Sequence, residues 1–381
     1  MGKKSFIEKQ ERGKLQKIAS STEIQELASK NKVRSVGSSY YLKAWRHWRT
    51  LAIEAIRFEL SKNLPHPSDK AKFENLFFQL GVAADEGKMP SFSDKGARSG
   101  YALEFFCRGR NLADLFILDT LNPLHSFSDE WTSAILNTPL YEGNGISSAI
   151  VESSFDTSSY NMVSLGGGPG FDFVGAALAT TFNSNGLTIT SPLRATILDY
   201  EEGWSDLVTA MDTATRNILQ QPNLSCKWGG KCDITKPMND PSNIACRKEI
   251  SSTNLWTCQY CVAENRNLLH ESNFIFFKDL FELAPDGAIF IFTETTPRIW
   301  PDFCKLIEHH FKGDMEVGFN KNGRQMLLRK GKILTEEGRA TIMMNDHHAN
   351  QLEKYSKIVE CHERKLSSGY QRQQQKIRGA K

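Results

Sequence analysis

The spacing of hydrophobic residues changes near residue 160. Before that point, apolar side chains recur every three or four positions, as in SYYLKAWRHWRTLAIEAIRFELSK at 39–62, and this period is typical of an amphipathic helix. The same period predicts further helices at 70–85 and 98–120. The first part of the chain is therefore expected to be helical.

After residue 160, short apolar runs alternate with helical stretches, which is the pattern of a sheet built from strand–helix units. Strands are expected at 161–165, 193–199, 224–228, 254–261, 287–293, 314–319 and 325–329. Helices are expected between them at 171–182, 204–219, 272–284 and 298–311. A turn signal, NKNG at 320–323, joins the last two strands. The pattern predicts an α/β fold with a mostly parallel, seven-stranded sheet that ends in a C-terminal antiparallel hairpin.

These patterns divide the chain into three predicted parts. Residues 1–145 form a basic, helical N-terminal extension, residues 146–331 form the α/β domain, and residues 332–381 form a basic tail that is helical or disordered. Within the tail, a charged helix is expected at 347–366.

The composition excludes several classes of protein. Apolar residues make up 40% of the chain and charged residues 24%, which is close to globular averages and excludes wholesale disorder. No run of about 18 apolar residues is present, so no membrane span is expected. The charged start MGKKSFIEKQERGK lacks the apolar stretch of a signal peptide, and the 8 cysteines are then expected to be reduced thiols. We expect an intracellular protein, cytoplasmic or nuclear.

Charge is unevenly distributed along the chain. The net charge is +3, but residues 1–60 carry +7 and residues 351–381 carry +5, which leaves −9 for the middle. The basic ends could contact the phosphates of RNA, or they could be solvated helices and tails. Arginines alternate with aromatic residues in the first helix, which would suit phosphates and bases: Arg46, Arg49 and Arg57 among Tyr40, Tyr41, Trp45 and Trp48. At helical spacing, Trp45, Trp48 and Leu51 could equally be a stripe of core residues.

The segment MVSLGGGPGFDFVGAAL at 162–178 is the most informative part of the chain. An apolar strand leads into Gly166, Gly167, Gly168 and Gly170, and an amphipathic helix follows. Glycines permit a tight turn and let a ligand approach the backbone, while the first amides of a helix point their dipoles at the ligand. A plain strand–helix turn rarely needs four glycines in five positions, so a ligand-binding loop is predicted.

The spacing of these glycines selects among ligands. The dinucleotide fingerprint needs glycine or alanine at its last position, and the two possible frames place Phe171 or Phe173 there. No Gly-Lys-Ser/Thr follows, so the loop is not a P-loop. The shorter G-x-G-x-G form fits at Gly166, Gly168 and Gly170, and it resembles motif I of the class I S-adenosylmethionine-dependent methyltransferases. The resemblance covers about 170 of the 381 residues, and it implies a Rossmann-like, seven-stranded methyltransferase sheet and S-adenosyl-L-methionine as the cofactor.

The resemblance assigns cofactor contacts to residues at the ends of the expected strands. Asp199, the acid that ends the second strand, would accept hydrogen bonds from the ribose hydroxyls, and Tyr200 or Trp204 would cover the adenine. Trp204 could instead pack on the helix that follows. After the third strand, Asp233 would lie near the adenine amino group and Ile234 against the ring, although Asp233 could also be an ordinary turn acid.

One position departs from the family pattern. Ser164 stands where many members carry an acid that helps to hold the amino-acid part of the cofactor. Asp172 could replace that acid, or a water molecule could mediate the contact. The fourth strand, LWTCQYCVAEN, resembles motif IV, which lines the methyl-transfer pocket in the family. This likeness places Tyr260 among the expected cofactor contacts.

Polar residues beyond the fourth and fifth strands are the catalytic candidates: Glu264, Asn265 and Glu294. All would lie at the carboxyl edge of the sheet, where ligands bind in open α/β folds, but each could also be a helix cap or a surface residue. The Asn/Asp-Pro-Pro-aromatic motif of exocyclic amino methylation is absent. An imide or hydroxyl acceptor would need a proton acceptor, and Glu264 is our choice for it, with Asn265 beside it.

The cysteines offer weaker alternatives. Cys258 and Cys261 have the spacing of a zinc or redox pair, but a second pair is absent, and in the predicted strand the two would face opposite sides. No metal site is therefore expected. Cys261 could also be the nucleophile of a 5-methylcytosine mechanism, but the usual Pro-Cys context is missing.

The residues and the resemblance together predict an S-adenosylmethionine-dependent methyltransferase that works by direct, in-line attack, with RNA as the favoured acceptor. The glycine loop, Asp199 and Trp204-Ser205 also look distantly like the fungal large-subunit rRNA uridine-N3 methyltransferases. The alternatives are a methyltransferase of a small molecule or a protein, a nicotinamide-dependent oxidoreductase, and a non-catalytic cofactor-binding protein.

Overall fold

The computed structural model describes residues 38–86, 88, 91–106, 108–121, 160–184, 192–295, 299–311, 314–319 and 324–331. The predicted hairpin turn at 320–323, the tail helix at 347–366 and the domain boundary near residue 145 lie outside these residues.

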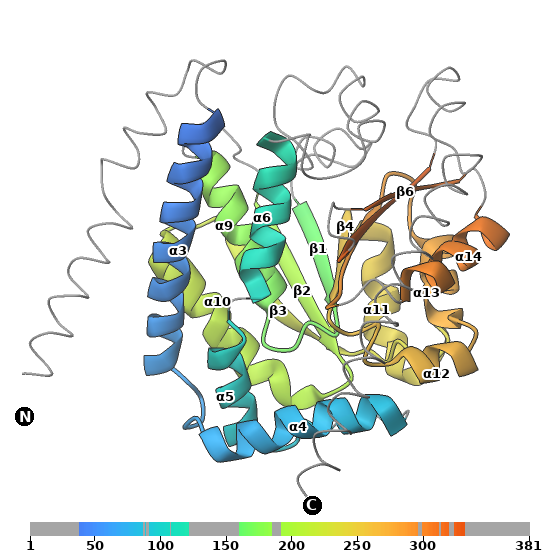
Figure 1. Ribbon diagram of the computed structural model, residues 1–381, viewed down its shortest axis with the longest axis horizontal. Coiled ribbons are helices and arrows are strands. Elements are labelled where there is room, and N and C mark those ends of the chain that lie inside the picture. The colour runs from blue at the N-terminus through green and yellow to red at the C-terminus, as the bar shows by residue number, and fades with distance from the viewer. Residues whose placement is uncertain are drawn as a thin grey trace, which may run out of the picture.

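In the described part of the chain, a seven-stranded sheet has the order β3-β2-β1-β4-β5-β7-β6. The strands are β1 (Tyr160–Leu165), β2 (Leu193–Asp199), β3 (Leu224–Lys231), β4 (Leu255–Gln259), β5 (Ile289–Thr293), β6 (Met315–Phe319) and β7 (Gln325–Lys330). β7 runs antiparallel to both of its neighbours, β5 and β6, and the other described pairings are parallel. The predicted α/β fold with a C-terminal antiparallel pair is confirmed (Figure 1).

The central strands are buried on both faces because helices cover both sides of the sheet. Every residue of β4 (LWTCQ) and β5 (IFIFT) is buried, as expected for the continuous apolar runs of parallel strands. β4 ends at Gln259, two residues earlier than predicted, because the backbone of Tyr260 enters the left-handed region with a φ of 60°.

The helices of the α/β part lie in two groups, one on each face of the sheet (Figure 1). One face carries α9 (Phe171–Ser184) and α10 (Ser205–Leu219), and the other carries α11 (Ile244–Glu249), α12 (Arg266–Glu271), α13 (Ile275–Leu283) and α14 (Trp300–His310). Successive strand residues alternate between the two apolar cores, as Met162 and Val163 do. The short helices α11 and α12 are absent from the sequence prediction. None of the described helices is long and apolar enough to cross a bilayer.

Four helices precede the sheet in the chain and form an N-terminal helical layer: α3 (Ser38–Lys62), α4 (Lys70–Glu86), α5 (Lys95–Glu104) and α6 (Arg108–Leu121). α3 packs on α10 and α9, α6 packs on α9, and α4 packs on α5. Their apolar side chains belong to the same core as that face of the sheet. The single helix predicted at 98–120 is two helices in the structure, because Phe105 leaves helical geometry and its N–H closes α5 on the carbonyl oxygen of Tyr101.

Two glycines let α6 lie very close to α9. A Cβ atom at Gly175 would lie 2.6 Å from the carbonyl oxygen of Gly109, and a Cβ atom at Gly109 would lie 2.9 Å from the carbonyl oxygen of Phe171. Any side chain at either position would force the helices apart. The contact therefore fixes α6, with Arg108 and Asn111, against the helix that follows the glycine loop.

The aromatic stripe of α3 is a packing surface. The side chain of Trp45 is 0% exposed and that of Trp48 is 5% exposed. The indole nitrogen of Trp45 donates to Asp114 at 2.9 Å, and Arg49 forms an ion pair with the same carboxylate. Because both rings are buried, the alternative of a core stripe is confirmed for Trp45 and Trp48, and neither ring can stack on RNA bases.

Candidate functional site

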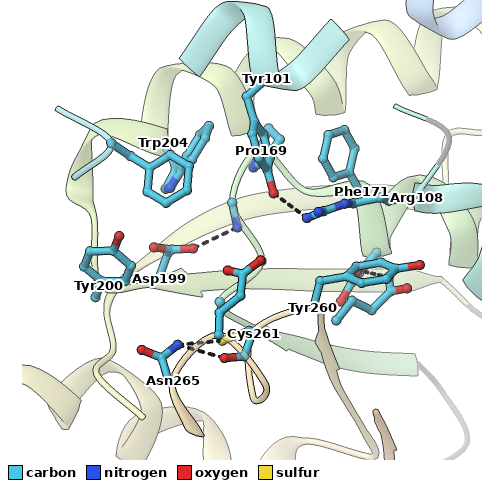
Figure 2. A pocket seen from close by; sticks show the side chains of 17 residues that line it. Tyr101, Arg108, Pro169, Phe171, Asp199, Tyr200, Trp204, Tyr260, Cys261 and Asn265 are labelled. Carbon is cyan, nitrogen blue, oxygen red and sulfur yellow. Dashed lines mark hydrogen bonds between the residues drawn. The ribbon is translucent and has the colours of Figure 1, made fainter. Parts of the chain in front are cut away.

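A cavity opens at the carboxyl ends of β1, β2 and β4, where the glycine loop leaves β1 (Figure 2). It holds about 630 Å³, its open mouth included. Its walls come from the loop, from the residues after β2 and β4, and from the N-terminal helical layer. Ligands of open α/β sheets bind at this edge.

Most of the residues predicted for the site line this one cavity: Gly166, Gly167, Gly168, Asp172, Asp199, Tyr200, Trp204, Tyr260, Glu264 and Asn265. Gly170, Asp233 and Ile234 do not line it. Positions spread over 100 residues of sequence are thus brought together, as the strand ends of a parallel sheet require.

Hydrogen bonds and glycine conformations give the loop its shape. The N–H of Gly167 donates to a carbonyl oxygen of β2 at 3.1 Å, and the N–H of Gly170 closes the turn on Gly167 at 2.9 Å. Gly166 and Gly168 have φ values of 60° and 50°, a region that disfavours other residues. A Cβ atom at Gly166 would also lie 2.4 Å from the sulfur of Cys261. Gly170 therefore has a structural part in the loop rather than a place in the cavity wall.

Asp199 links the loop to the end of β2. Its side chain is 5% exposed, and one carboxylate oxygen accepts the N–H of Gly168 at 3.0 Å (Figure 2). The other oxygen accepts the N–H of Glu201, also at 3.0 Å. Burial raises the pKa of Asp199 to about 6, because the charged form is poorly solvated there. Each oxygen has a second lone pair, so the carboxylate can still accept a hydrogen bond from a ligand.

Asp172 reaches from α9 to the ends of β1 and β4. Its carboxylate accepts hydrogen bonds from the hydroxyl of Ser164 at 2.7 Å, from the hydroxyl of Thr257 and from the amide of Gln259. The side chain is 3% exposed, and burial raises its pKa. The carboxylate of Asp172 therefore lies against Ser164, and its role as a replacement acid for the cofactor stays a prediction.

Aromatic rings form the wall next to Asp199. The ring of Trp204 is 1% exposed and lies against Gly168, where a Cβ atom would be 3.8 Å from it. Its centroid is 5.1 Å from that of Phe92 and 5.6 Å from that of Tyr101. Trp204 therefore lines the cavity and packs on Phe92 and Tyr101, and its contact with adenine stays a prediction.

Phe92, Tyr101 and Arg108 line the cavity but were not foreseen from the sequence. They come from the N-terminal helical layer, more than 50 residues before β1, and no motif marks them. The guanidinium of Arg108 lies 4.4 Å from the ring centroid of Tyr260 and donates a hydrogen bond to the hydroxyl of Tyr101. The amide of Asn111 donates to the hydroxyl of Tyr260, which joins the helical layer to the end of β4.

Glu264 and Asn265 lie in the cavity wall after β4. The carboxylate of Glu264 makes no hydrogen bond or ion pair with any described residue, and burial raises its pKa to about 7 while the charge of Arg108 opposes that rise. The amide of Asn265 donates to the carbonyl oxygen of Cys261 at 2.8 Å, and its own side-chain oxygen is buried without a partner among the described residues.

Glu294, the third catalytic candidate, has a structural place instead. It does not line the cavity, and its carboxylate accepts the N–H groups of Val262 and Ala263 at 2.8 and 3.1 Å. The side chain is 1% exposed, and burial raises its pKa to about 8. Glu294 thus shapes the turn that presents Glu264.

Asp233 and Ile234 lie away from the cavity. One carboxylate oxygen of Asp233 accepts the N–H of Thr235 at 2.9 Å and its hydroxyl at 2.6 Å, so this residue is a turn acid. Ile234 is 4% exposed and packs in the core on the opposite face from α9. The structure does not bring either residue to the other predicted cofactor contacts.

The described cysteines give no support to a metal site or to a nucleophilic thiol in the cavity. The described residues contain no group of three or more His, Cys, Asp or Glu side chains that could hold a metal ion. Cys261 lines the cavity, but a hydrogen bond with the thiol of Cys258 and burial both raise its pKa. A nucleophilic cysteine needs the opposite shift, so the structure gives no support to a 5-methylcytosine mechanism.

The charges and unpaired atoms of the cavity indicate the chemistry of its ligand. Among its lining residues are three carboxylates, Asp172, Asp199 and Glu264, and one guanidinium, that of Arg108. The side-chain oxygens of Gln259 and Asn265 are buried without partners in the described part of the chain. Buried acceptors normally have a hydrogen-bond donor. The cavity therefore suits a ligand with cationic or donor groups, one anionic group and an aromatic ring.

Comparison with known proteins gives only weak similarity. No family model matches the chain, and no curated protein is significantly similar in sequence. A Listeria monocytogenes protein described as a class I S-adenosylmethionine-dependent methyltransferase is 10% identical, with a TM-score of 0.33 over 75% of this chain and 90% of that one. An O-methyltransferase family protein from Burkholderia thailandensis is 11% identical, with a TM-score of 0.29 over 76% and 96%.

The human N-acetylserotonin methyltransferase, solved with S-adenosylmethionine, is 12% identical, with a TM-score of 0.28 over 75% of this chain and 68% of that one. Similarity at this level decides nothing about the present chain. Its function has to come from its own residues.

Proposed function

We propose that this protein is an S-adenosylmethionine-dependent methyltransferase whose acceptor is RNA. The observation that carries the proposal is the loop at the carboxyl end of β1, where Asp199 holds the N–H of Gly168 inside a cavity lined by aromatic rings and acids. The cofactor joins a nucleoside to an amino acid through a sulfonium. The donors, acceptors and charges of the cavity suit all three parts.

Each part of the cofactor has candidate contacts. Asp199 and the glycine loop would hold the nucleoside sugar, and the rings of Tyr200 and Trp204 would hold the base. The unpaired oxygen of Gln259 and the carboxylate of Asp172 would accept the ammonium hydrogens, because they lie at the other end of the loop. Asp233 and Ile234 have no part in this assignment.

When bound, the cofactor supplies a methyl group already activated by its sulfonium. The protein then has to align the acceptor, exclude water and remove the acceptor's proton. Glu264 suits the last task, since it faces the cavity without a partner among the described residues and its pKa of about 7 balances proton affinity against ionisation at neutral pH. Asn265 lies beside it and could orient the acceptor through its unpaired oxygen.

The proposal of RNA rests on charge. Residues 1–60 carry +7 and residues 351–381 carry +5, while the middle of the chain is acidic. Clustered basic residues at both ends suit a phosphate backbone. A distant likeness of the glycine loop and Trp204-Ser205 to the fungal rRNA uridine-N3 methyltransferases agrees with this acceptor. A small molecule or a protein is the alternative acceptor.

The test is to incubate the full chain with labelled S-adenosylmethionine and separate RNA, protein and metabolite fractions. We expect label in RNA, its loss in Glu264→Gln, and its retention in Glu271→Gln, which alters an exposed acid of α12. Label in another fraction would replace RNA as the acceptor. Cofactor binding without label in any fraction would indicate a binding protein, and tight binding of NADH instead would indicate an oxidoreductase.

A further inference from the structure

Arg108 carries the positive charge in a cavity wall that otherwise contains acids. It begins α6, and its guanidinium makes one hydrogen bond, to the hydroxyl of Tyr101. It forms no ion pair with any carboxylate in the described part of the chain. An arginine has five N–H donors in a planar fork, so most of its donors stay available to a ligand.

The guanidinium is held in place before any ligand arrives. It lies 4.4 Å from the ring centroid of Phe105 and 4.4 Å from that of Tyr260. The Tyr260 ring is itself fixed by Asn111, and its backbone has a φ of 60°. A cation ordered in this way loses little conformational freedom when an anion binds.

The position of Arg108 relates it to one end of the cavity. Figure 2 shows Asp199, Tyr200 and Trp204 at one end, and Arg108, Phe171 and Tyr260 at the other. If the nucleoside lies at the Asp199 end, the amino-acid part of the cofactor lies at the Arg108 end. Asp172 and Gln259 would then accept the hydrogens of its ammonium group, and its carboxylate would need a different partner.

We propose that Arg108 binds the carboxylate of the cofactor's amino-acid part, so that a residue of the N-terminal helical layer selects for the complete cofactor. This inference rests on the proposed function. An arginine fork and a carboxylate form paired, charge-assisted hydrogen bonds, whereas an exposed cation would lose much of its attraction to solvent. Ligands that lack the carboxylate should therefore gain nothing from Arg108.

The experiment compares two stable ligands by isothermal titration calorimetry. S-adenosylhomocysteine carries the carboxylate, and 5′-methylthioadenosine lacks the whole amino-acid part. We expect Arg108→Met to lower the affinity for S-adenosylhomocysteine by about 10- to 100-fold, as the loss of a charge-assisted hydrogen bond requires. The affinity for 5′-methylthioadenosine should change by less than about 2-fold. Arg108→Lys, which keeps the charge but not the fork, should give an intermediate loss.

Arg110→Met is the matched control, because Arg110 is an exposed arginine of the same helix. It should leave both affinities unchanged. If Arg108→Met lowered the affinity for both ligands equally, or lowered neither affinity, the inference would be overturned while the proposed function stands. Failure of the unaltered protein to bind S-adenosylhomocysteine would overturn the proposed function and this inference together. Thermal unfolding of each variant identifies any loss that comes from misfolding, in which case the Arg108→Lys comparison decides.

Discussion

Glu264 and Glu294 are glutamates on neighbouring turns, and their partners give them different roles. Glu294 accepts two backbone N–H groups and is 1% exposed, whereas Glu264 faces the cavity and has no described partner. Burial raises the pKa of both. A buried acid that is already used by the backbone supports the fold, and one left unused is available for chemistry.

Glu264→Gln should lower kcat by about 10²- to 10⁴-fold, the usual contribution of a general base, and change the affinity for S-adenosylhomocysteine by less than about 3-fold. The kcat of the unaltered protein should rise with pH through about 7, because Glu264 acts only when ionised. A pH–rate series on both proteins measures this. The same rise in Glu264→Gln would assign the titration to another group.

Glu294→Ala should destabilise the fold by about 1–3 kcal/mol, since two buried N–H groups lose their acceptor. Glu294→Gln keeps one acceptor oxygen and should destabilise the fold less than Glu294→Ala does. Urea denaturation measures both, with Glu271→Ala as the exposed control. If Glu294→Ala and that control had the same free energy of unfolding, the hydrogen bonds to Val262 and Ala263 would make no net contribution to stability.

The sequence could separate some residues but not others. Asp199 ends β2 and Asp233 follows β3, yet only Asp199 reaches the cavity. A local signal existed for Asp233, because an acid two residues before a threonine often caps its own turn, as it does with Thr235. No local signal distinguishes Glu264 from Glu294, since their roles depend on contacts across 30 residues of chain.

The contact between α6 and α9 decides where the helical layer meets the site. Gly109 and Gly175 let the two backbones approach, and α6 then carries Arg108 and Asn111 to the cavity edge. The strands and the glycine loop could be predicted because their patterns are local. The break between α5 and α6 could not, because the apolar period continues through Phe105, and the wall formed by this layer depends on how the helices dock.

Gly175→Ala should destabilise the protein by about 1–3 kcal/mol, because the new Cβ atom would lie 2.6 Å from a backbone oxygen of α6 and would push that helix away. The shift should also lower the affinity for S-adenosylhomocysteine, since it moves Arg108. Denaturation and calorimetry measure the two effects. Thr180→Ala, on the same helix, is the control; a destabilised variant with full affinity would show that α6 can move without altering the cavity.

At the scale of the whole molecule, buried acids make stability depend on pH. Asp199 and Glu294 have folded pKa values of about 6 and about 8, both above their ordinary values. A folded state that binds a proton more tightly than the unfolded state is favoured at low pH and loses that advantage as pH rises through the folded pKa. The contribution of these two groups to the stability of the folded, ligand-free protein is therefore largest below about pH 4.

The free energy of unfolding should fall between pH 5 and pH 8, by at most about 1.4 kcal/mol per pH unit for each such carboxyl. Glu294→Gln should flatten this slope up to about pH 8, because its amide does not titrate. Urea denaturation at several pH values tests the slope. An unchanged slope in Glu294→Gln would mean that other groups cause it.

The hydrogen bond from Asn111 to Tyr260 spans 149 positions of the chain and ties the outer helices to the rim of the cavity. Thermodynamic reciprocity follows from such a tie. If a bound cofactor changes the position of α6, then a macromolecule that prefers one position of α6 will change the affinity of the protein for the cofactor. The cofactor must then change the affinity of the protein for that macromolecule by the same factor. Binding of the acceptor and binding of the cofactor would then be coupled through the position of α6.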